Sequence, residues 1–237
     1  MKIVLFDIDG TLVKSGACFG DGKPLRSLFI HSMKEVFGVD TRLEEDISGW
    51  TDRGIFLHLA QKAGISIEDA ERHMNELVDA AVGYVNAGIA TARIELLDGV
   101  VELLDALKAK GYHLGLLTGN IPEIARAKLS KTGIYRYFEF GGFGTISDIR
   151  HKLIDHAIRE AESKFGNEID RGEVFYFGDA VRDVEAGKAA GVVTIAVATG
   201  IQHISRLQGA HPDYLLRDLS NTAEVVGIID GKGQNVR

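Results

Sequence analysis

The 237-residue chain has very little cysteine and proline and no long apolar run. Cys18 is the only cysteine, which excludes an intramolecular disulfide framework and suits a reducing compartment. The three prolines argue against long proline-rich linkers. No apolar stretch approaches the roughly 20 residues that a membrane-spanning helix needs. Only four apolar residues follow Lys2 before the first acid, too few for a signal peptide. We therefore expect a cytoplasmic protein with no membrane partner.

Positive charge is also scarce, because 27 lysines and arginines face 34 acidic residues and give a formal net charge of −7. This balance argues against a nucleic-acid partner. Hydrophobic residues make up 45% of the chain, enough at this length for one core and a smaller second unit. Composition leaves open whether the protein is a monomer or a homodimer.

The first eleven residues, MKIVLFDIDGT, form the most informative segment. An apolar run over 3–6 ends abruptly at Asp7 and Asp9, and such a run is typical of a buried strand in a parallel sheet. Ligands of these sheets bind beyond the carboxyl ends of the strands, so both aspartates are predicted to lie at the mouth of a site. Neighbouring carboxylates repel each other unless a cation or a shared proton relieves them, and Mg²⁺ prefers hard oxygen ligands.

Amphipathic helical patterns fill residues from about 20 to 94. They cover 25–37 and 52–63, and then continue from Ser66, which opens a capping box, to Val85. This part of the chain is therefore predicted to be all-helical.

From Leu96 onward, strand and helix patterns alternate. Strands are predicted at 113–117, 137–140, 174–177, 193–197 and 214–216. Alternation favours a parallel sheet covered by helices on both faces. The predicted fold is α/β, with a Rossmann-like core (1–15 and 95–237) and a small all-helical cap domain (16–94) inserted after the first strand. An insert at that point lies over the predicted site, as a lid would.

Further polar residues follow two other predicted strands, and a basic pair precedes one of those strands. They are Thr118, Gly119 and Asn120 after 113–117, Asp179 and Asp183 after 174–177, and Arg150 and Lys152 at the start of the preceding helix. Because parallel strands share one carboxyl edge, all of these residues are predicted to meet Asp7 and Asp9 there.

In this order the segments resemble the four motifs of the haloacid dehalogenase superfamily. These are Asp-x-Asp-Gly-Thr at 7–11, a threonine after the second strand, a basic residue, and Gly-Asp-x-x-x-Asp at 178–183. The helical insert is similar to the family's α-helical cap, and the whole chain most resembles phosphoglycolate-phosphatase-like hydrolases. The resemblance implies a phosphatase that uses Mg²⁺ and acts on a small phosphorylated metabolite.

The resemblance also implies catalytic roles. Asp7 would attack phosphorus to form an aspartyl-phosphate, and Asp9 would protonate the leaving alkoxide and then activate water. Halide leaves without a proton, so the presence of Asp9 argues for phosphoryl rather than haloacid chemistry. Thr118 and backbone N–H groups near Gly119 and Asn120 would bind phosphoryl oxygens.

A Mg²⁺ site is implied at the same edge of the sheet. Asp7 and Asp179 would supply carboxylates, and Asp9 its backbone carbonyl. Asp183 would support the metal's waters or the neighbouring cation. The ion would neutralise charge that gathers on the phosphoryl oxygens.

The basic residue departs most from the family pattern. Many relatives have a lysine followed by proline, whereas residues 148–153 read DIRHKL. Arg150 is preferred, because the segment resembles related sequences of the Asp-x-Arg kind that place the arginine at this position. The planar fork of an arginine would also grip both phosphate and Asp7. Lys152 is the alternative.

Residues 49–53, GWTDR, resemble the cap loop that relatives present to the site. In that interpretation Arg53 binds an acidic substrate tail and Trp50 forms a wall of the pocket. An equal alternative places Trp50 in the cap core and leaves Arg53 as a solvated charge.

The predicted activity is hydrolysis of a small phosphomonoester, with phosphoglycolate as the first choice. A phosphomutase of the β-phosphoglucomutase kind would share all four motifs. A phosphonate hydrolase would need a cap lysine, for which Lys34 and Lys62 qualify only by location.

Overall fold

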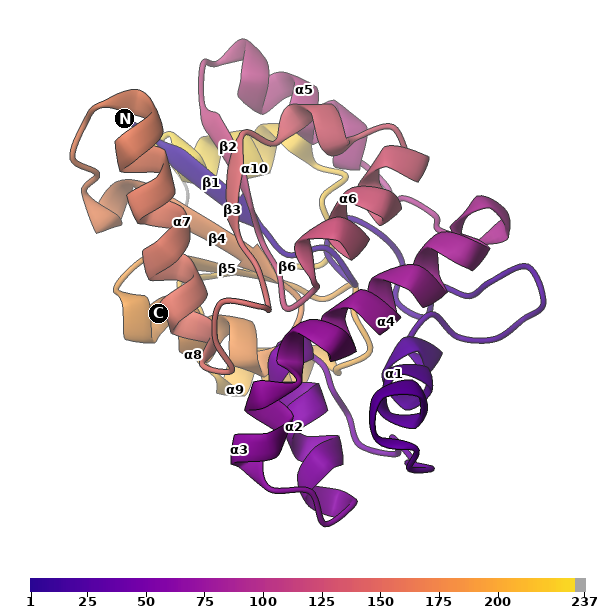
Figure 1. Cartoon of the computed structure of the whole chain (residues 1–237). Coiled ribbons are helices and arrows are strands. Elements are labelled where there is room, and N and C mark those ends of the chain that lie inside the picture. Colours follow the sequence, from indigo (N-terminus) through magenta and orange to yellow (C-terminus); the bar gives the residue numbers. More distant parts are fainter. Residues whose placement is uncertain (233–237) are drawn as a thin grey trace.

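The computed structural model describes residues 1–232 and contains a six-stranded parallel sheet in the order β3-β2-β1-β4-β5-β6 (Figure 1). The strands are β1 (Ile3–Phe6), β2 (His113–Leu117), β3 (Phe140–Gly142), β4 (Val174–Gly178), β5 (Val193–Val197) and β6 (Tyr214–Leu216). The order reverses between β1 and β4, the position where ligands bind in doubly wound folds. The predicted α/β fold with a parallel sheet is confirmed.

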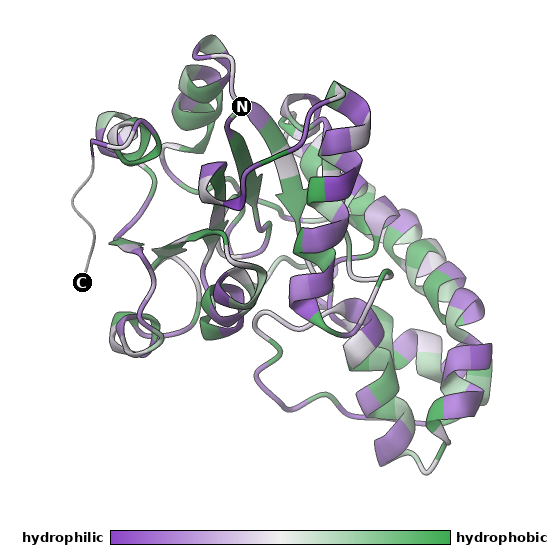
Figure 2. Cartoon of the chain, turned by 90° about the vertical axis from the view of Figure 1, so that its left-hand side faces the viewer, coloured by the Kyte–Doolittle hydropathy of each residue, from purple (hydrophilic) through white to green (hydrophobic). Residues whose placement is uncertain are grey.

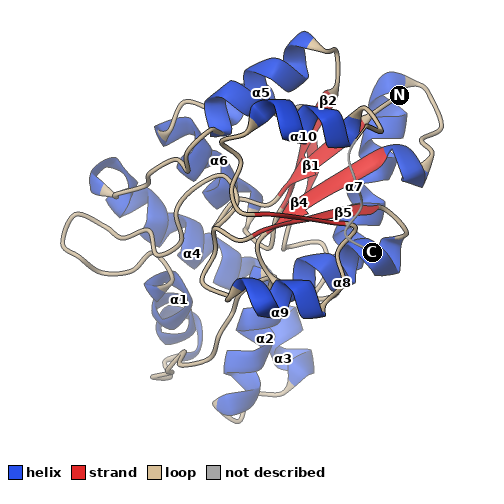
Figure 3. Ribbon diagram, turned by 180° about the vertical axis from the view of Figure 1, so that it is seen from behind, coloured by secondary structure: helices blue, strands red, loops and turns tan. Residues whose placement is uncertain are grey.

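Helices cover both faces of the sheet because its central strand is apolar on both sides (Figure 3). Val4 and Phe6 pack in a cluster with α5 (Val100–Ala109), α6 (Pro122–Lys131) and α10 (Thr222–Ile229). Ile3 and Leu5 pack in another with α7 (Arg150–Phe165) and α8 (Val181–Ala190). Figure 2 shows the strands as mostly hydrophobic, whereas the helices carry both hydrophobic and hydrophilic residues. A short helix, α9 (Ile204–Gly209), packs beside α8 through Leu207.

Four helices between β1 and β2 form the cap, and Figure 1 shows them beside the carboxyl ends of the strands. They are α1 (Ser27–Phe37), α2 (Asp52–Lys62), α3 (Ile67–Arg72) and α4 (Met74–Gly88). Their apolar faces build a cluster of their own that includes Phe56, Leu59 and Leu77, and Ile121 and Ile124 of the core join it. The cap is therefore packed against the start of α6. Its predicted boundaries, 16 and 94, stay a prediction.

The two segments that connect the cap to the core run side by side in opposite directions. Val13 bridges to Leu96, and Cys18 bridges to Arg93, both in antiparallel fashion. This pairing ties the entry of the cap to its exit, so the insert begins and ends at one place on the core.

Helix ends follow the signals in the sequence. The side-chain oxygen of Thr51 accepts a hydrogen bond from the Gly54 N–H at 3.1 Å, and that of Ser66 accepts one from the Asp69 N–H at 3.0 Å. Gly38 closes α1 with φ of 69°, a left-handed conformation that favours glycine. Within residues 1–232, no helix combines the length and the apolar character that crossing a membrane requires.

The predicted strand at 137–140 is wrong in position. Residues Tyr135–Tyr137 form a 3₁₀ turn, and β3 begins at Phe140 and includes Gly141 and Gly142. A Cβ on Gly142 would overlap the backbone carbonyl of Leu153, so α7 lies too close to this strand for any side chain there. The apolar pattern could not show this strand, because two of its three residues have no side chain.

We expect Leu77→Ala to destabilise the protein by about 2–5 kcal/mol, because the Leu77 side chain is fully buried in the cap cluster and its loss leaves a cavity. Chemical denaturation of the wild type and the variant measures this difference. Asn75→Ala, an exposed position on the same helix, is the control and should change stability by less than about 0.5 kcal/mol. Equal effects of the two substitutions would contradict the placement of Leu77 in the core.

Candidate active site

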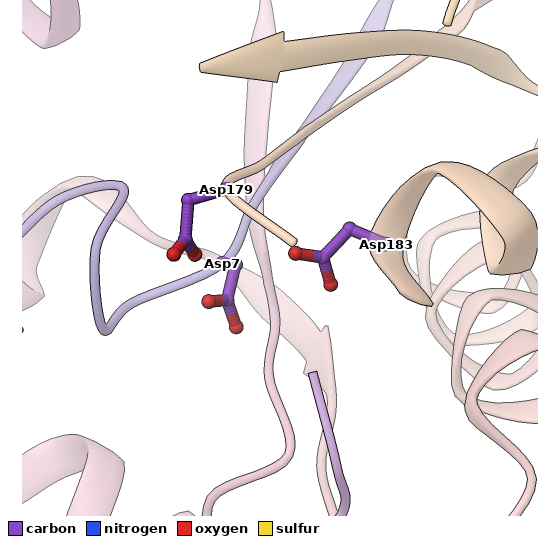
Figure 4. Close-up of side chains that lie close together, drawn as sticks. All are labelled: Asp7, Asp179 and Asp183. Carbon is purple, nitrogen blue, oxygen red and sulfur yellow. The ribbon is translucent and has the colours of Figure 1, made fainter. Parts of the chain in front are cut away.

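Three buried aspartates meet at the carboxyl ends of β1 and β4 (Figure 4). Asp7 directly follows β1, Asp179 directly follows β4, and Asp183 lies in the first turn of α8. One carboxylate oxygen of each lies within 4.8 Å of the others. The sheet therefore brings together three of the predicted metal-site residues.

The Asp179 carboxylate is enclosed by backbone. A Cβ on Gly10, whose φ is +90°, would overlap this carboxylate, and a Cβ on Gly200 would do the same. Burial, together with the negative charges of Asp183 and Asp7, raises the pKa of Asp179 well above its ordinary value. This carboxylate lies within 4.8 Å of those of Asp7 and Asp183. A buried carboxylate beside two others suits a bound cation.

The Arg150 guanidinium holds the other two aspartates. Its Nη2 lies 2.9 Å from Oδ1 of Asp7 and 2.7 Å from Oδ1 of Asp183. The same nitrogen donates to the Tyr176 hydroxyl at 2.9 Å, and that hydroxyl donates to Asp183 at 2.7 Å. Nη1 donates to the Gly49 carbonyl of the cap loop at 3.3 Å. The structure thus brings Arg150 to Asp7, whereas Lys152 is exposed on α7.

Burial raises the pKa of Asp7 from 3.8 to about 7, and the positive charge of Arg150 only partly opposes this. The nearby carboxylates of Asp183 and Asp9 raise it further. Arg150 alone therefore does not offset the cost of burying the ionised form of Asp7, and an added cation would stabilise that form further.

Asp9 belongs to a second polar network. Lys128 Nζ lies 2.6 Å from Oδ2 of Asp9 and 2.6 Å from Oδ1 of Asn120. The Asn120 amide donates to the same Asp9 oxygen at 3.1 Å. Asp9 and Asn120 are thus brought together, and both line a cavity that lies between the cap and the core.

Lys128 was missed by the sequence analysis, although the sequence carries a signal for it. It lies four residues after Ile124 in α6, so it occupies the buried face of that helix. A lysine on an apolar helix face is expected to have a polar partner, since burying an unpaired charge is costly. Tyr176, in the apolar run of β4, carried no comparable signal.

The formal charge of the site suits a divalent cation. The four carboxylates of Asp7, Asp9, Asp179 and Asp183 are accompanied by two cations, Arg150 and Lys128. The fully ionised site would carry a formal charge of −2, which one Mg²⁺ would balance. Carboxylate oxygens are also the donors that Mg²⁺ prefers. The residues present therefore fit the ion.

Thr118 is completely buried after β2, and its hydroxyl accepts a hydrogen bond from the Asn120 N–H at 3.2 Å. Gly119 touches the cap, because a Cβ there would overlap the carbonyl of Trp50. Thr118 thus shapes the loop from which Gly119 and Asn120 face the cavity.

Asp52 fastens the cap to this loop. Its N–H donates to the Gly119 carbonyl at 2.7 Å, and its carboxylate accepts from the Ile121 N–H at 2.8 Å. The neighbouring Arg53 N–H donates to the Gly144 carbonyl at 3.3 Å. Sequence reasoning saw only a helix start at Asp52, because its partner loop lies far along the chain.

The two predicted cap-loop residues have different surroundings. Trp50 lines the cavity, and the Arg182 guanidinium lies 5.1 Å from its ring centroid. The Arg53 side chain instead forms an ion pair with Glu71 inside the cap. Only Trp50 faces the predicted substrate region.

A cavity of about 450 Å³ lies between the cap and the core. Asp7, Asp9, Asp179, Arg150 and Lys128 line its core side, and residues of α1, α2 and the cap loop line the other side. Its volume lies within the range of small-molecule sites, roughly 300–1,000 Å³.

The sequence matches the haloacid dehalogenase-like hydrolase family over residues 1–191. The chain belongs to this family. The predicted superfamily and the prediction of a hydrolase are thereby confirmed.

Two relatives among the similar proteins are phosphate-releasing enzymes by name. A phosphoglycolate phosphatase of Synechococcus elongatus is 28% identical over 230 residues, 95% of this chain and 97% of that protein. Pyrophosphatase PpaX of Bacillus velezensis is 35% identical over 130 residues, 54% of this chain and 58% of that protein. The crystal structure of a predicted phosphatase from Clostridium acetobutylicum has a TM-score of 0.68 and 21% identity, with 95% of this chain and 98% of that chain covered. It supports the fold alone.

We expect Asp52→Asn to stabilise the protein increasingly as the pH rises. Burial raises the pKa of Asp52 from 3.8 to about 7, and the Ile121 N–H and the charge of Lys128 only partly oppose this. The protonated carboxyl therefore stabilises the folded wild type at a pH below the pKa that Asp52 has in the unfolded chain. This stabilisation is lost as the pH rises toward the pKa of Asp52 in the folded protein. Relative to wild type, the variant should gain about 1–3 kcal/mol in free energy of unfolding between about pH 4.5 and about pH 7.5.

Chemical denaturation at both pH values measures this gain. Asp79→Asn, at an exposed position of α4, is the matched control and should show no such trend. A difference between Asp52→Asn and wild type that stays constant with pH would contradict the buried, protonated carboxyl.

Proposed function

We propose that this hydrolase is a Mg²⁺-dependent phosphatase that hydrolyses a small phosphomonoester through an aspartyl-phosphate on Asp7. The observation that carries the proposal is that two neighbouring aspartates are held by different partners. Asp7 is buried against Arg150 and beside Asp179, whereas Asp9 faces the cavity and is held by Lys128 and Asn120. A nucleophile and an acid–base group need such separate surroundings.

In the first step the Asp7 carboxylate attacks phosphorus, and the bond to the leaving alkoxide breaks. The Arg150 guanidinium, already bonded to Asp7, is placed to bind the incoming phosphoryl group with its planar fork. Asp9 gives a proton to the leaving oxygen, and its hydrogen bonds to Lys128 and Asn120 fix its orientation. Asp7, Asp179 and the Asp9 carbonyl would hold Mg²⁺, whose positive charge would offset the negative charge on the transferring group.

In the second step Asp9 takes a proton from water, which attacks the phosphoryl group and frees Asp7. Asp183 supports both steps without touching the substrate, because its oxygens are bonded to Arg150, Tyr176 and the Ala180 N–H. Thr118, Gly119 and Asn120 form the loop proposed to bind the phosphoryl oxygens.

Phosphoglycolate is the first substrate to assay, since the motif resemblance and the name of one relative point to it. Pyrophosphate is the second, from the name of another. The two cap lysines that a phosphonate hydrolase could use are exposed and paired with acidic residues. Lys34 pairs with Asp40 at 2.9 Å, and Lys62 pairs with Glu45 at 2.6 Å. A phosphomutase is distinguished by its product, a rearranged ester.

We expect phosphate release from small phosphoesters that requires Mg²⁺ and stops when a chelator is added. Asp7→Asn should reduce release by at least about a thousandfold, since the amide cannot act as the nucleophile. A phosphate assay on wild type, Asp7→Asn and the exposed control Asp79→Asn measures both effects. Circular dichroism checks that Asp7→Asn is folded.

Release that continues in Asp7→Asn, or in the presence of chelator, would contradict the proposal. Conversion of a sugar phosphate to its isomer without release of phosphate would favour the mutase instead.

A further inference from the structure

Several apolar side chains of the cap line the cavity that the aspartates face. Leu25, Leu28 and Phe29 of the α1 region line it, together with Ile47 and Trp50 of the cap loop. Leu25, Leu28 and Phe29 are less than 5% exposed, whereas Ile47 is half-buried. A group that leaves the phosphorus toward the cap therefore meets hydrocarbon.

The core contributes a further apolar residue on the same cavity. Ile201, in the loop after β5, lines the cavity and is 68% exposed, the highest value among the large exposed apolar side chains of the described chain. Its loop reaches the cap, because the Gln202 amide donates to Asp46 at 3.1 Å. An apolar ligand in the cavity would cover this isoleucine together with the apolar side chains of the cap.

The cations that line this cavity are largely committed to the aspartates. Arg150 pairs with Asp7 and Asp183, and Lys128 pairs with Asp9. Arg26 also lines the cavity but is exposed to solvent. Arg53, the predicted partner for an acidic tail, pairs with Glu71 and does not line the cavity.

Besides the solvated Arg26, the cap adds an acidic group to the wall. Asp52 lines the cavity, and its carboxyl accepts a hydrogen bond from the Ile121 N–H. Ionised or protonated, it offers no positive charge to a carboxylate on the substrate. A carboxylate buried against this wall would lose water without gaining a partner, which is costly.

We propose that the cap side of this cavity receives the apolar organic group of a phosphomonoester, so that esters of small apolar alcohols are better substrates than esters of hydroxy acids. This inference rests on the phosphatase function proposed above. It assigns the leaving-group pocket to Leu25, Leu28, Phe29, Ile47 and Ile201, with the phosphoryl group at Asp7.

The test compares isobutyl phosphate with phosphoglycolate. The two esters are nearly isosteric, since two methyl groups replace the carboxylate oxygens, and both leave as primary alkoxides. We expect kcat/KM with Mg²⁺ to be at least about tenfold higher for isobutyl phosphate, the scale of discrimination that an apolar pocket provides.

Two variants locate the preference in the wall. Ile47→Arg adds a cation at a half-buried position and should shift the ratio of the two kcat/KM values toward phosphoglycolate by about tenfold. Ile47→Ala, which removes the same side chain without adding charge, should weaken the preference for isobutyl phosphate but shift the ratio much less than Ile47→Arg does. Arg26→Gln should leave the wild-type ratio unchanged, because its side chain is solvated.

Each outcome bears on the inference. If both esters release phosphate but phosphoglycolate is equal or better, the apolar pocket is wrong and the phosphatase function stands. If phosphoglycolate turnover is lost in Arg26→Gln, Arg26 is the acid-binding residue and the inference is again overturned. If neither these esters nor any other releases phosphate, both proposals fail. The wild-type ratio decides the matter even if Ile47→Arg does not fold.

Discussion

Crowding of negative charge at the carboxyl ends of β1 and β4 is the constraint on which the rest of this site depends. Asp7, Asp179 and Asp183 are each less than 10% exposed, and Asp9 lies beside them. Carboxylates so close together and so poorly hydrated stay ionised only if positive charge is built in around them. Arg150 and Lys128 supply part of that charge, and a divalent cation would supply the remainder.

The same requirement explains how the cap is attached. Arg150, which pairs with Asp7 and Asp183, also donates to the Gly49 carbonyl, so one side chain connects the aspartates with the cap loop. Close to this contact, the cap loop meets the core where Gly119 and Gly144 allow backbone to lie against backbone. The aspartates and the cap are therefore connected through loops that touch, and in the proposed function the leaving group would lie between them.

Much of the architecture could be predicted from the sequence because its signals are local. An apolar run that ends in Asp7 marks both a central strand and a site, and Thr51, Ser66 and Gly38 mark helix ends by their own hydrogen bonds and dihedral angles. The short helices α9 and α10 follow the predicted strands without having been identified. The position of β3 could not be predicted, because two of its three residues are glycines. Its place in the sheet depends on how closely α7 approaches it.

Residues whose role depends on distant partners were harder to predict from the sequence. Lys128, Asp52 and Tyr176 acquire their functions from Asp9, Ile121 and Arg150, which lie between 26 and 119 positions away in the chain. Arg53 is the opposite case. It occupies a motif-like position, but its side chain pairs with Glu71 within the cap. A single sequence shows which residue types are present, but not which of them meet.

The central claim is that Asp7 itself accepts the phosphoryl group, and direct detection of that group tests it. Wild-type protein mixed with Mg²⁺ and a phosphoester, quenched in acid and digested, would be analysed by mass spectrometry. We expect the peptide that contains Asp7 and Asp9 to gain the mass of one phosphoryl group, with fragmentation that assigns it to Asp7. Turnover with no modified peptide at any quench time, or a phosphoryl group on another residue, would contradict the account.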